Sequence, residues 1–165
     1  MNNIQLINDD YKGHVDIFRH ACRGILVHDE NVLLVFQSKG NRYIIPGGGV
    51  EEGESLEQCC EREMLEETGM KVRVLQNYVK IEELFDVWNY INNYFVCELI
   101  EDTGKLNLTE LEKKAGCVPE WKSFDEALEI FGKYEQYRKT DISIYGLYRR
   151  EYIALREFKN QVASQ

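Results

Sequence analysis

Residues 48–70 read GGVEEGESLEQCCEREMLEETGM, a glycine-rich loop followed by an amphipathic segment. Ser55 followed by Gln58 fits the capping box, in which two side chains accept hydrogen bonds from free N–H groups of the first helical turn. Gly69 suits a helix C-terminus, because glycine readily adopts the left-handed conformation found there. The stretch therefore predicts one helix over about residues 55–68, placed between a glycine loop and a strand that begins near Met70.

Three acidic residues of this helix fall on one face. At about 100° per residue they span an arc of about 100°; they are Glu63, Glu66 and Glu67. The same face carries the apolar positions Leu56, Cys59 and Cys60. A solvated acidic stripe should lie opposite the apolar positions, whereas these acids continue the apolar face. Carboxylates that cluster and point inward repel one another and lose hydration, so they require cations.

A divalent cation meets this requirement. Carboxylate oxygens suit Mg²⁺ or Mn²⁺, which keep several waters and bridge to substrate phosphates. The glycine loop can approach such an ion closely and offer backbone carbonyls, and Gly47 is well placed to do so. An ordinary surface helix remains the alternative, since Arg62–Glu66 and Glu67–Lys71 have the i,i+4 spacing of surface ion pairs.

The combination of loop and acidic helix resembles the Nudix family. The family signature is Gly, five residues, Glu, seven residues, Arg-Glu, an aliphatic, one residue, Glu-Glu, one residue, Gly and an aliphatic. The matching residues here are Gly48, Glu54, Arg62-Glu63, Met64, Glu66-Glu67, Gly69 and Met70. Every fixed position matches, and methionine stands at both aliphatic positions, where the family more often has a branched residue. The resemblance implies an α/β/α sandwich around a mixed β-sheet, with the signature as loop–helix–loop.

The order of predicted elements agrees with an α+β fold. Strands are expected at about 19–27, 32–36, 43–45, 70–74, 77–84, 88–100 and 120–121, and helices after the first at about 110–114, 123–131 and 141–159. Residues 1–16 are interpreted as a polar lead-in, and residues 17–160 as a single domain. Strands therefore come first, one helix is inserted, more strands follow, and helices end the chain.

The resemblance also implies roles for single residues. Members of the family mostly hydrolyse a nucleoside diphosphate linked to another group, using Mg²⁺ or Mn²⁺. By position, Glu63 and Glu67 are the expected principal metal ligands, with Glu66 close to the same ions. The carbonyl of Gly47 is a further expected ligand. The expected orienting pair, which holds the acidic side chains in place, is Arg62 and Glu54.

The general base is not settled by the signature, because some family members use a glutamate in a loop late in the domain. Glu112 is the first candidate here, and Glu110 and Glu120 are the others. A carboxylate in this role takes the proton of the attacking water, with an efficiency set by its pKa and geometry. The alternative for each residue is a solvated loop acid.

Residues that contact the substrate are less clearly marked. Arg23 and Arg42 are candidates for phosphate binding, and Trp88 is the first candidate to stack on a base, with Tyr90 and Tyr94 beside it. The alternatives are surface charges and core aromatics. The pair Arg149-Arg150 on the last helix is expected at the surface. The position where the ADP-ribose group of the family tends to carry proline holds Phe85, so that subgroup is not indicated.

The composition of the chain limits the kinds of partner and the cellular location that we expect. The chain has 165 residues with a net charge of −9, which disfavours nucleic acid as the main partner. Its apolar runs fall short of the roughly 20 residues of a membrane helix, and residues 1–10 do not resemble a signal peptide. Five cysteines without a Cys-x-x-Cys motif suggest reduced thiols and a cytoplasmic location. A homodimer is left open as an alternative to a monomer.

Three kinds of function are compatible with these observations. The first is a metal-dependent pyrophosphohydrolase that acts on a nucleoside diphosphate derivative as its small-molecule substrate. The second is a Nudix module that binds a nucleotide without turnover, and a Nudix-like isomerase is a third. The complete set of signature acids favours the hydrolase, because members without turnover usually have damaged signatures.

Overall fold

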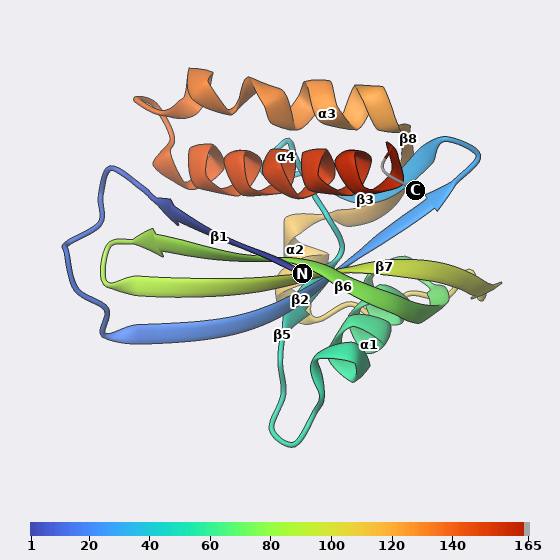
Figure 1. Ribbon diagram of the computed structural model, residues 1–165. Coiled ribbons are helices and arrows are strands. Elements are labelled where there is room, and N and C mark those ends of the chain that lie inside the picture. The colour runs from blue at the N-terminus through green and yellow to red at the C-terminus, as the bar shows by residue number, and fades with distance from the viewer. Residues whose placement is uncertain (164–165) are drawn as a thin grey trace.

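A mixed β-sheet runs through the centre of the molecule (Figure 1). The structure is a computed structural model, and it describes residues 1–163. Its strands are β1 (Asn2–Ile7), β2 (Ile17–His28), β3 (Asn31–Gln37), β4 (Arg42–Ile44), β5 (Gly47–Gly49), β6 (Met70–Phe85), β7 (Trp88–Asp102) and β8 (Cys117–Ser123). The main order is β1-β6-β7-β2-β3-β4, with β5 paired to β2 and β8 paired to β3. The pairs β1–β6 and β2–β7 are parallel and the others antiparallel, so the sheet is mixed as expected.

Helices cover both faces of this sheet. They are α1 (Leu56–Thr68), α2 (Glu110–Ala115), α3 (Phe124–Gly132) and α4 (Ile142–Ala163), with a short 3₁₀ helix, η1 (Lys133–Tyr137), before α4. Figure 1 shows α3 and α4 on one face and α1 on the other. The expected sandwich of helices around a mixed sheet is therefore confirmed.

Helix α1 begins and ends where the sequence predicts. The Ser55 hydroxyl accepts a hydrogen bond from the Gln58 N–H at 3.1 Å, and the Gln58 side chain accepts one from the Ser55 N–H at 2.9 Å. Gly69 ends the helix in the left-handed conformation, with φ of 74°. Both ends are set by residues within the helix and its caps, which is why the sequence predicts them well.

The core is divided by the sheet into two apolar clusters. The cluster on the α1 side includes Cys22, Leu26, Cys59, Cys60, Met64, Phe95 and Cys97. The cluster on the α4 side includes Ile25, Ile81, Tyr78, Tyr94, Phe131 and Leu155. All five cysteines are buried and free. The acidic helix is thus anchored by small thiol side chains packed against β2 and β7.

Two parts of the chain differ from the sequence-based expectation. The predicted polar lead-in contains strand β1, which pairs in parallel with β6 and places Leu6 in the α4-side cluster. Half of its residues are asparagine or glutamine and its apolar alternation is short, which is why the sequence suggested a polar segment. The two strands expected at 70–74 and 77–84 form one strand, β6, because shifts of register near Gln76 and Tyr78 interrupt the alternation without ending the pairing.

None of the helices in residues 1–163 combines the length and the apolar composition needed to cross a membrane.

Gly146 of α4 lies where a side chain would strike its neighbours. A Cβ atom there would lie 2.7 Å from Asn8 Nδ2 and still closer to the Glu83 carboxylate. Glycine to alanine inside a helix ordinarily stabilises by about 1 kcal/mol. For Gly146→Ala we expect the opposite sign, a loss of about 1–3 kcal/mol in the free energy of unfolding, because both neighbours are buried and hydrogen-bonded. Urea unfolding measures the change.

Ser143→Ala, at an exposed position of the same helix, is the matched control. It should change stability by no more than about 0.5 kcal/mol. Stabilisation by Gly146→Ala would contradict the packing described here.

Candidate active site

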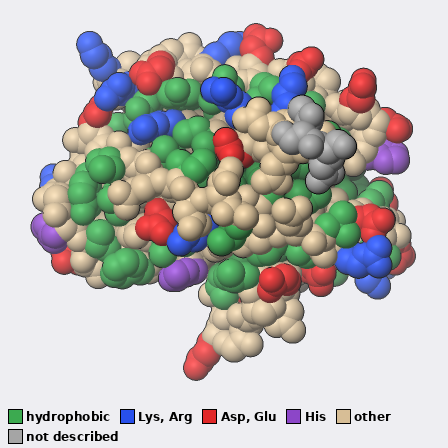
Figure 2. All heavy atoms as spheres, viewed as in Figure 1, with side chains coloured by type: hydrophobic (Ala, Val, Ile, Leu, Met, Phe, Trp, Pro, Cys, Tyr) green, Lys and Arg blue, Asp and Glu red, His purple; other side chains and the backbone are tan. Residues whose placement is uncertain are grey.

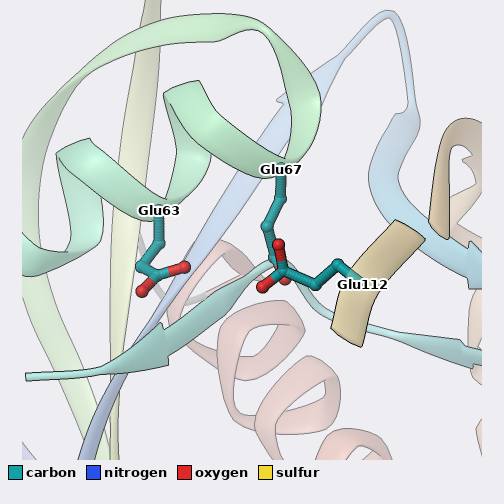
Figure 3. Close-up of side chains that lie close together, drawn as sticks. All are labelled: Glu63, Glu67 and Glu112. Atoms are coloured by element: carbon teal, nitrogen blue, oxygen red, sulfur yellow. The ribbon is translucent and has the colours of Figure 1, made fainter. Parts of the chain in front are cut away.

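Three carboxylates from two helices meet above β5 (Figure 3). Glu63 and Glu67 lie one turn apart on α1 and are 8% and 7% exposed. Glu112 reaches them from α2, so that one oxygen of each of the three lies within 4.8 Å of the others. We call Glu63, Glu67 and Glu112 the acidic cluster.

Glu112 is held in this cluster by the cap of its own helix. The Thr109 N–H donates a hydrogen bond to Glu112 Oε2 at 2.7 Å, and the Glu112 N–H donates one to the Thr109 hydroxyl at 3.3 Å. The other two candidate loop acids lie elsewhere. Glu110 is exposed and pairs with Lys113 at 2.8 Å, and Glu120 accepts a hydrogen bond from the Tyr43 hydroxyl at 3.0 Å. Among the three candidates the structure brings only Glu112 to the acidic face of α1.

The electrostatics of α1 reflect the burial of like charges. The pKa of Glu67 is raised to about 8, chiefly by burial; the Gly47 N–H and Arg23 lower it, and the charges of Glu63 and Glu112 contribute to the rise. The Gly47 N–H donates to Glu67 Oε2 at 2.8 Å. Burial also raises the pKa of Glu63, and Arg62 opposes this shift. The cluster is therefore an unfavourable site for negative charge unless a cation enters it.

Arg62 is the cation that orients the acids of the helix. Its Nε and Nη2 bind the two oxygens of Glu54 at 2.7 and 3.0 Å, and its Nη1 binds Glu63 at 2.7 Å and Glu66 at 3.2 Å. The hydrogen bonds from Arg62 lower the pKa of Glu54 to about 2. Glu54 and Arg62 thus form the expected pair beside Glu63. Glu66 lies on the Arg62 side and is not in the acidic cluster.

The glycine loop passes directly beneath the acidic face. Gly47 pairs with Arg23 of β2 and has φ of 149°, and a Cβ atom there would collide with the Cys22 carbonyl. A Cβ at Gly48 would lie 2.7 Å or less from both oxygens of Glu63. Glycine at these positions therefore lets the backbone approach the carboxylates closely, which any larger residue would prevent.

The donor set of this site fits a hard divalent cation. The side-chain donors are all carboxylate oxygens, which suit Mg²⁺ and Mn²⁺ rather than softer metals. Arg62 contacts Glu63 but makes no ion pair with Glu67 or Glu112 among the described residues. A dication would compensate the charge that Arg62 does not reach. The residues present thus fit such a metal.

The two arginines predicted to contact phosphate are not surface charges. Arg23 is 3% exposed and donates to Asn92 Oδ1 at 3.0 Å and to the Ile45 carbonyl at 2.9 Å. Arg42 is half-buried and donates to Gln37 at 2.6 Å. Both line a pocket of about 300 Å³ on the α4 face of the sheet.

The aromatic candidates divide between this pocket and the core. Trp88 stacks on Phe85 with ring centroids 6.2 Å apart, and Phe85 rather than Trp88 lines the pocket. Tyr90 also lines it, whereas Tyr94 is fully buried in the core.

Arg150 is the main residue of this region that the sequence analysis misplaced. It was expected at the surface but is 3% exposed, and it donates to the Tyr94 hydroxyl at 3.0 Å and to Glu83 at 2.9 Å. The sequence signal that could have placed Arg150 is a pair of small residues, Gly146 and Ala154, four positions before and after it. Small residues at this spacing mark a face of α4 that packs closely against its neighbours. A charged residue between two small ones on such a face can be buried and paired.

The comparison with known families agrees with this geometry. The model of the NUDIX domain matches residues 18–142, most of the chain. The chain belongs to the Nudix hydrolase family. Among curated proteins it is similar to the NAD-capped RNA hydrolases NudC of Photobacterium profundum, 30% identical over 90 residues, and of Mannheimia succiniciproducens, 34% identical over 94 residues. These matches cover 52% and 56% of this chain but only 32% of either relative.

Solved structures show the same Nudix fold. A Nudix hydrolase from Nitrosomonas europaea superposes with a TM-score of 0.61 at 22% identity, covering 84% of this chain and 90% of that one. An ADP-ribose pyrophosphatase from Streptococcus suis gives 0.51 at 17% identity, covering 65% and 75%. At these identities the likeness concerns the fold alone.

The burial of Glu67 leads to a prediction for the metal-free protein. Glu67→Gln keeps the shape and an oxygen for the Gly47 N–H but removes the carboxyl group whose ionisation is opposed by burial and by Glu63, and with it the free-energy cost of burying that group at neutral pH. We expect the variant to gain about 1 kcal/mol of stability in a chelating buffer, or about 2–4 °C in Tm. Thermal unfolding followed by circular dichroism measures this.

Glu66→Gln is the control, because Glu66 is more exposed and bound to Arg62. It should show no gain. A lower Tm for Glu67→Gln would contradict the account of Glu67 as an uncompensated buried charge.

Proposed function

We propose that this protein is a metal-dependent hydrolase that cleaves the pyrophosphate bond of a nucleoside diphosphate linked to another group. The observation that carries the proposal is the acidic cluster, in which Glu112 joins the signature residues Glu63 and Glu67 within 4.8 Å. The names of the relatives, NAD-capped RNA hydrolase and ADP-ribose pyrophosphatase, support cleavage of a pyrophosphate in a nucleotide derivative.

The metal in this proposal is Mg²⁺ or Mn²⁺. Glu63, Glu67 and the carbonyl of Gly47 would hold it, with Glu66 close by. Such an ion, when bound, neutralises the pyrophosphate and lowers the pKa of a bound water. Arg62 and Glu54 would keep Glu63 oriented toward it, since the Arg62 guanidinium contacts both carboxylates at 2.7 Å.

Glu112 is the proposed general base. Thr109 holds its side chain in the acidic cluster, which supports a role beside a metal-bound water and the substrate phosphate. A carboxylate fixed in this way accepts the proton as the water attacks phosphorus. Arg23 and Arg42 would bind phosphate oxygens, because both residues line the pocket and Arg23 pairs with Gly47 of the glycine loop. Trp88 would support the base from behind Phe85, on which it stacks.

The substrate proposed is a small molecule rather than a nucleic acid. The net charge of −9 opposes binding to a polyanion. Figure 2 shows basic and acidic side chains interspersed over the face viewed there. We further infer a reducing, cytoplasmic setting from the five free cysteines.

A substrate screen tests the proposed reaction. With Mg²⁺ or Mn²⁺ we expect phosphate release, after phosphatase coupling, from at least one of nucleotide sugars, ADP-ribose, dinucleotides, dinucleoside polyphosphates and nucleoside triphosphates. Glu67→Gln should lower the rate by about 10²-fold or more, because a ligand charge of the metal site is lost. A wild type that is silent throughout, but is stabilised by a nucleotide, would indicate a binding module without turnover.

The role of Glu112 is tested separately. Glu112→Gln should reduce kcat by about 10²–10⁴-fold, the usual contribution of a general base, while Mn²⁺ binding measured by calorimetry changes less than in Glu67→Gln. Glu110→Gln in the same helix is the matched control and should retain activity, since Glu110 faces solvent beside Lys113. Equal activity of Glu112→Gln and wild type would exclude the proposed base.

A further inference from the structure

The pocket that contains Arg23 and Arg42 is walled in part by segments outside the Nudix match. Its volume is about 300 Å³, within the range of small-ligand sites. Asn8 and Asp10 border it from the turn after β1, and Leu147 borders it from α4. These three residues lie outside the 18–142 segment that matches the NUDIX domain. The Nudix signature therefore predicts none of the residues in this part of the pocket.

One end of the pocket is cationic. Arg23 lines it and pairs with Gly47, whose N–H donates to Glu67 at 2.8 Å, which links this end to the acidic cluster. Arg42 lines the same pocket and has no acidic partner within ion-pair distance in the described part of the chain. A phosphate entering between these two arginines would lie beside Ile44, three residues before Gly47 of the loop under the acidic cluster.

Asn8 at the pocket wall has an acceptor without a partner. Its side chain is buried, and its Nδ2 donates to Glu83 Oε1 at 2.9 Å. Glu83 also accepts from Arg150 at 2.9 Å, so its carboxylate acts as an acceptor and fixes the orientation of the Asn8 amide. Asn8 Oδ1 is buried with no hydrogen-bond partner within residues 1–163, and Asp10 Oδ1 is in the same condition. Unpaired buried acceptors are costly, so a ligand that supplies donors would be favoured here.

The turn that carries these two acceptors is held in place. Arg138 binds both oxygens of Asp9 at 2.7 and 2.9 Å, and Arg149 donates to the Ile7 carbonyl at 3.2 Å. The turn is thus tied to the segment around η1 and to α4. A pocket wall fixed on both sides can bind a ligand with little ordering cost.

We propose that this pocket binds a nucleobase that bears an exocyclic amino group, which donates to Asn8 Oδ1. The inference rests on the proposed function, because the phosphate of the same nucleotide would lie at the Arg23–Arg42 end. Apolar side chains of Ile44, Phe85 and Leu147 line the pocket and suit the faces of a flat ring. An amino group supplies the donor that the acceptor end needs, whereas a keto oxygen at the same ring position supplies none.

Nucleoside monophosphates in chelating buffer test the proposal without turnover. Wild-type binding is measured by calorimetry for AMP and GMP against IMP, and for CMP against UMP, since each pair differs by an amino group. We expect at least one amino-bearing nucleotide to bind about 10-fold more tightly than its reference, the value of one hydrogen bond to a buried acceptor. Ribose 5-phosphate, which lacks a base, should bind more weakly than that nucleotide.

A matched pair of variants assigns the preference to Asn8. Asn8→Ala should abolish the amino preference, while Asn89→Ala should keep it. Asn89 is also buried, with an unpaired Oδ1 and with Nδ2 3.4 Å from Glu82, but it does not line the pocket. The wild-type comparison needs no variant, so it decides the question even if Asn8→Ala does not fold.

Three results would overturn the proposal: no amino preference in either set, binding of ribose 5-phosphate as tight as that of the nucleotides, or no nucleotide binding at millimolar concentration. Failure here is distinct from failure of the proposed function. An enzyme that hydrolyses a pyrophosphate and depends on Glu67, yet shows no amino preference, would keep the reaction and refute the pocket assignment. Amino-selective binding without hydrolysis would support the pocket assignment and refute the proposed reaction.

Discussion

Burial of two like charges, one turn apart on α1, is the constraint on which the site depends. Glu63 and Glu67 lie almost out of solvent, and each has a pKa raised by that burial. The surroundings stabilise the charges only in part, through Arg62 on one side and the Gly47 N–H on the other. Capped ends hold the helix in register and a glycine loop lets the backbone approach, so the two carboxylates are compensated only in part by their neighbours, which is the basis of the proposed metal site.

A second buried charge network ties α4 to the sheet and continues from this site. Glu151 of α4 is fully buried between Arg23 and Arg150, at 3.7 and 2.8 Å. Arg23 in turn faces Asn92 of β7 and acts on the pKa of Glu67. Breaking one member of such a network leaves a buried charge without its partner, which costs more than the intact network contributes. The position of α4, and with it one wall of the pocket, therefore depends on Arg23, which also pairs with Gly47 of the loop beneath the acidic cluster.

Much of the site could be predicted from the sequence because its determinants are local. The caps of α1 and the shared face of its acids follow from spacing within residues 48–70. The Arg62–Glu54 pair and the late loop acid Glu112 were expected from the resemblance to the Nudix family. Asn8 and Arg150 were not, since their common partner Glu83 lies 75 and 67 residues away. Those contacts depend on the pairing of β1 with β6 and on the irregular register of β6. No local sequence pattern predicts either of these two features.

The family match covers the residues of the acidic cluster but not all of the residues that wall the pocket. The acidic cluster lies wholly inside the segment that matches the family, whereas Asn8, Leu147 and Arg150 lie outside it. Matches to the curated relatives cover about a third of their length. The signature acids and Glu112 therefore lie where the family model applies, whereas this wall of the pocket lies outside it. The family match supports the class of reaction, while the proposed substrate preference depends on pocket residues of this chain that the match does not include.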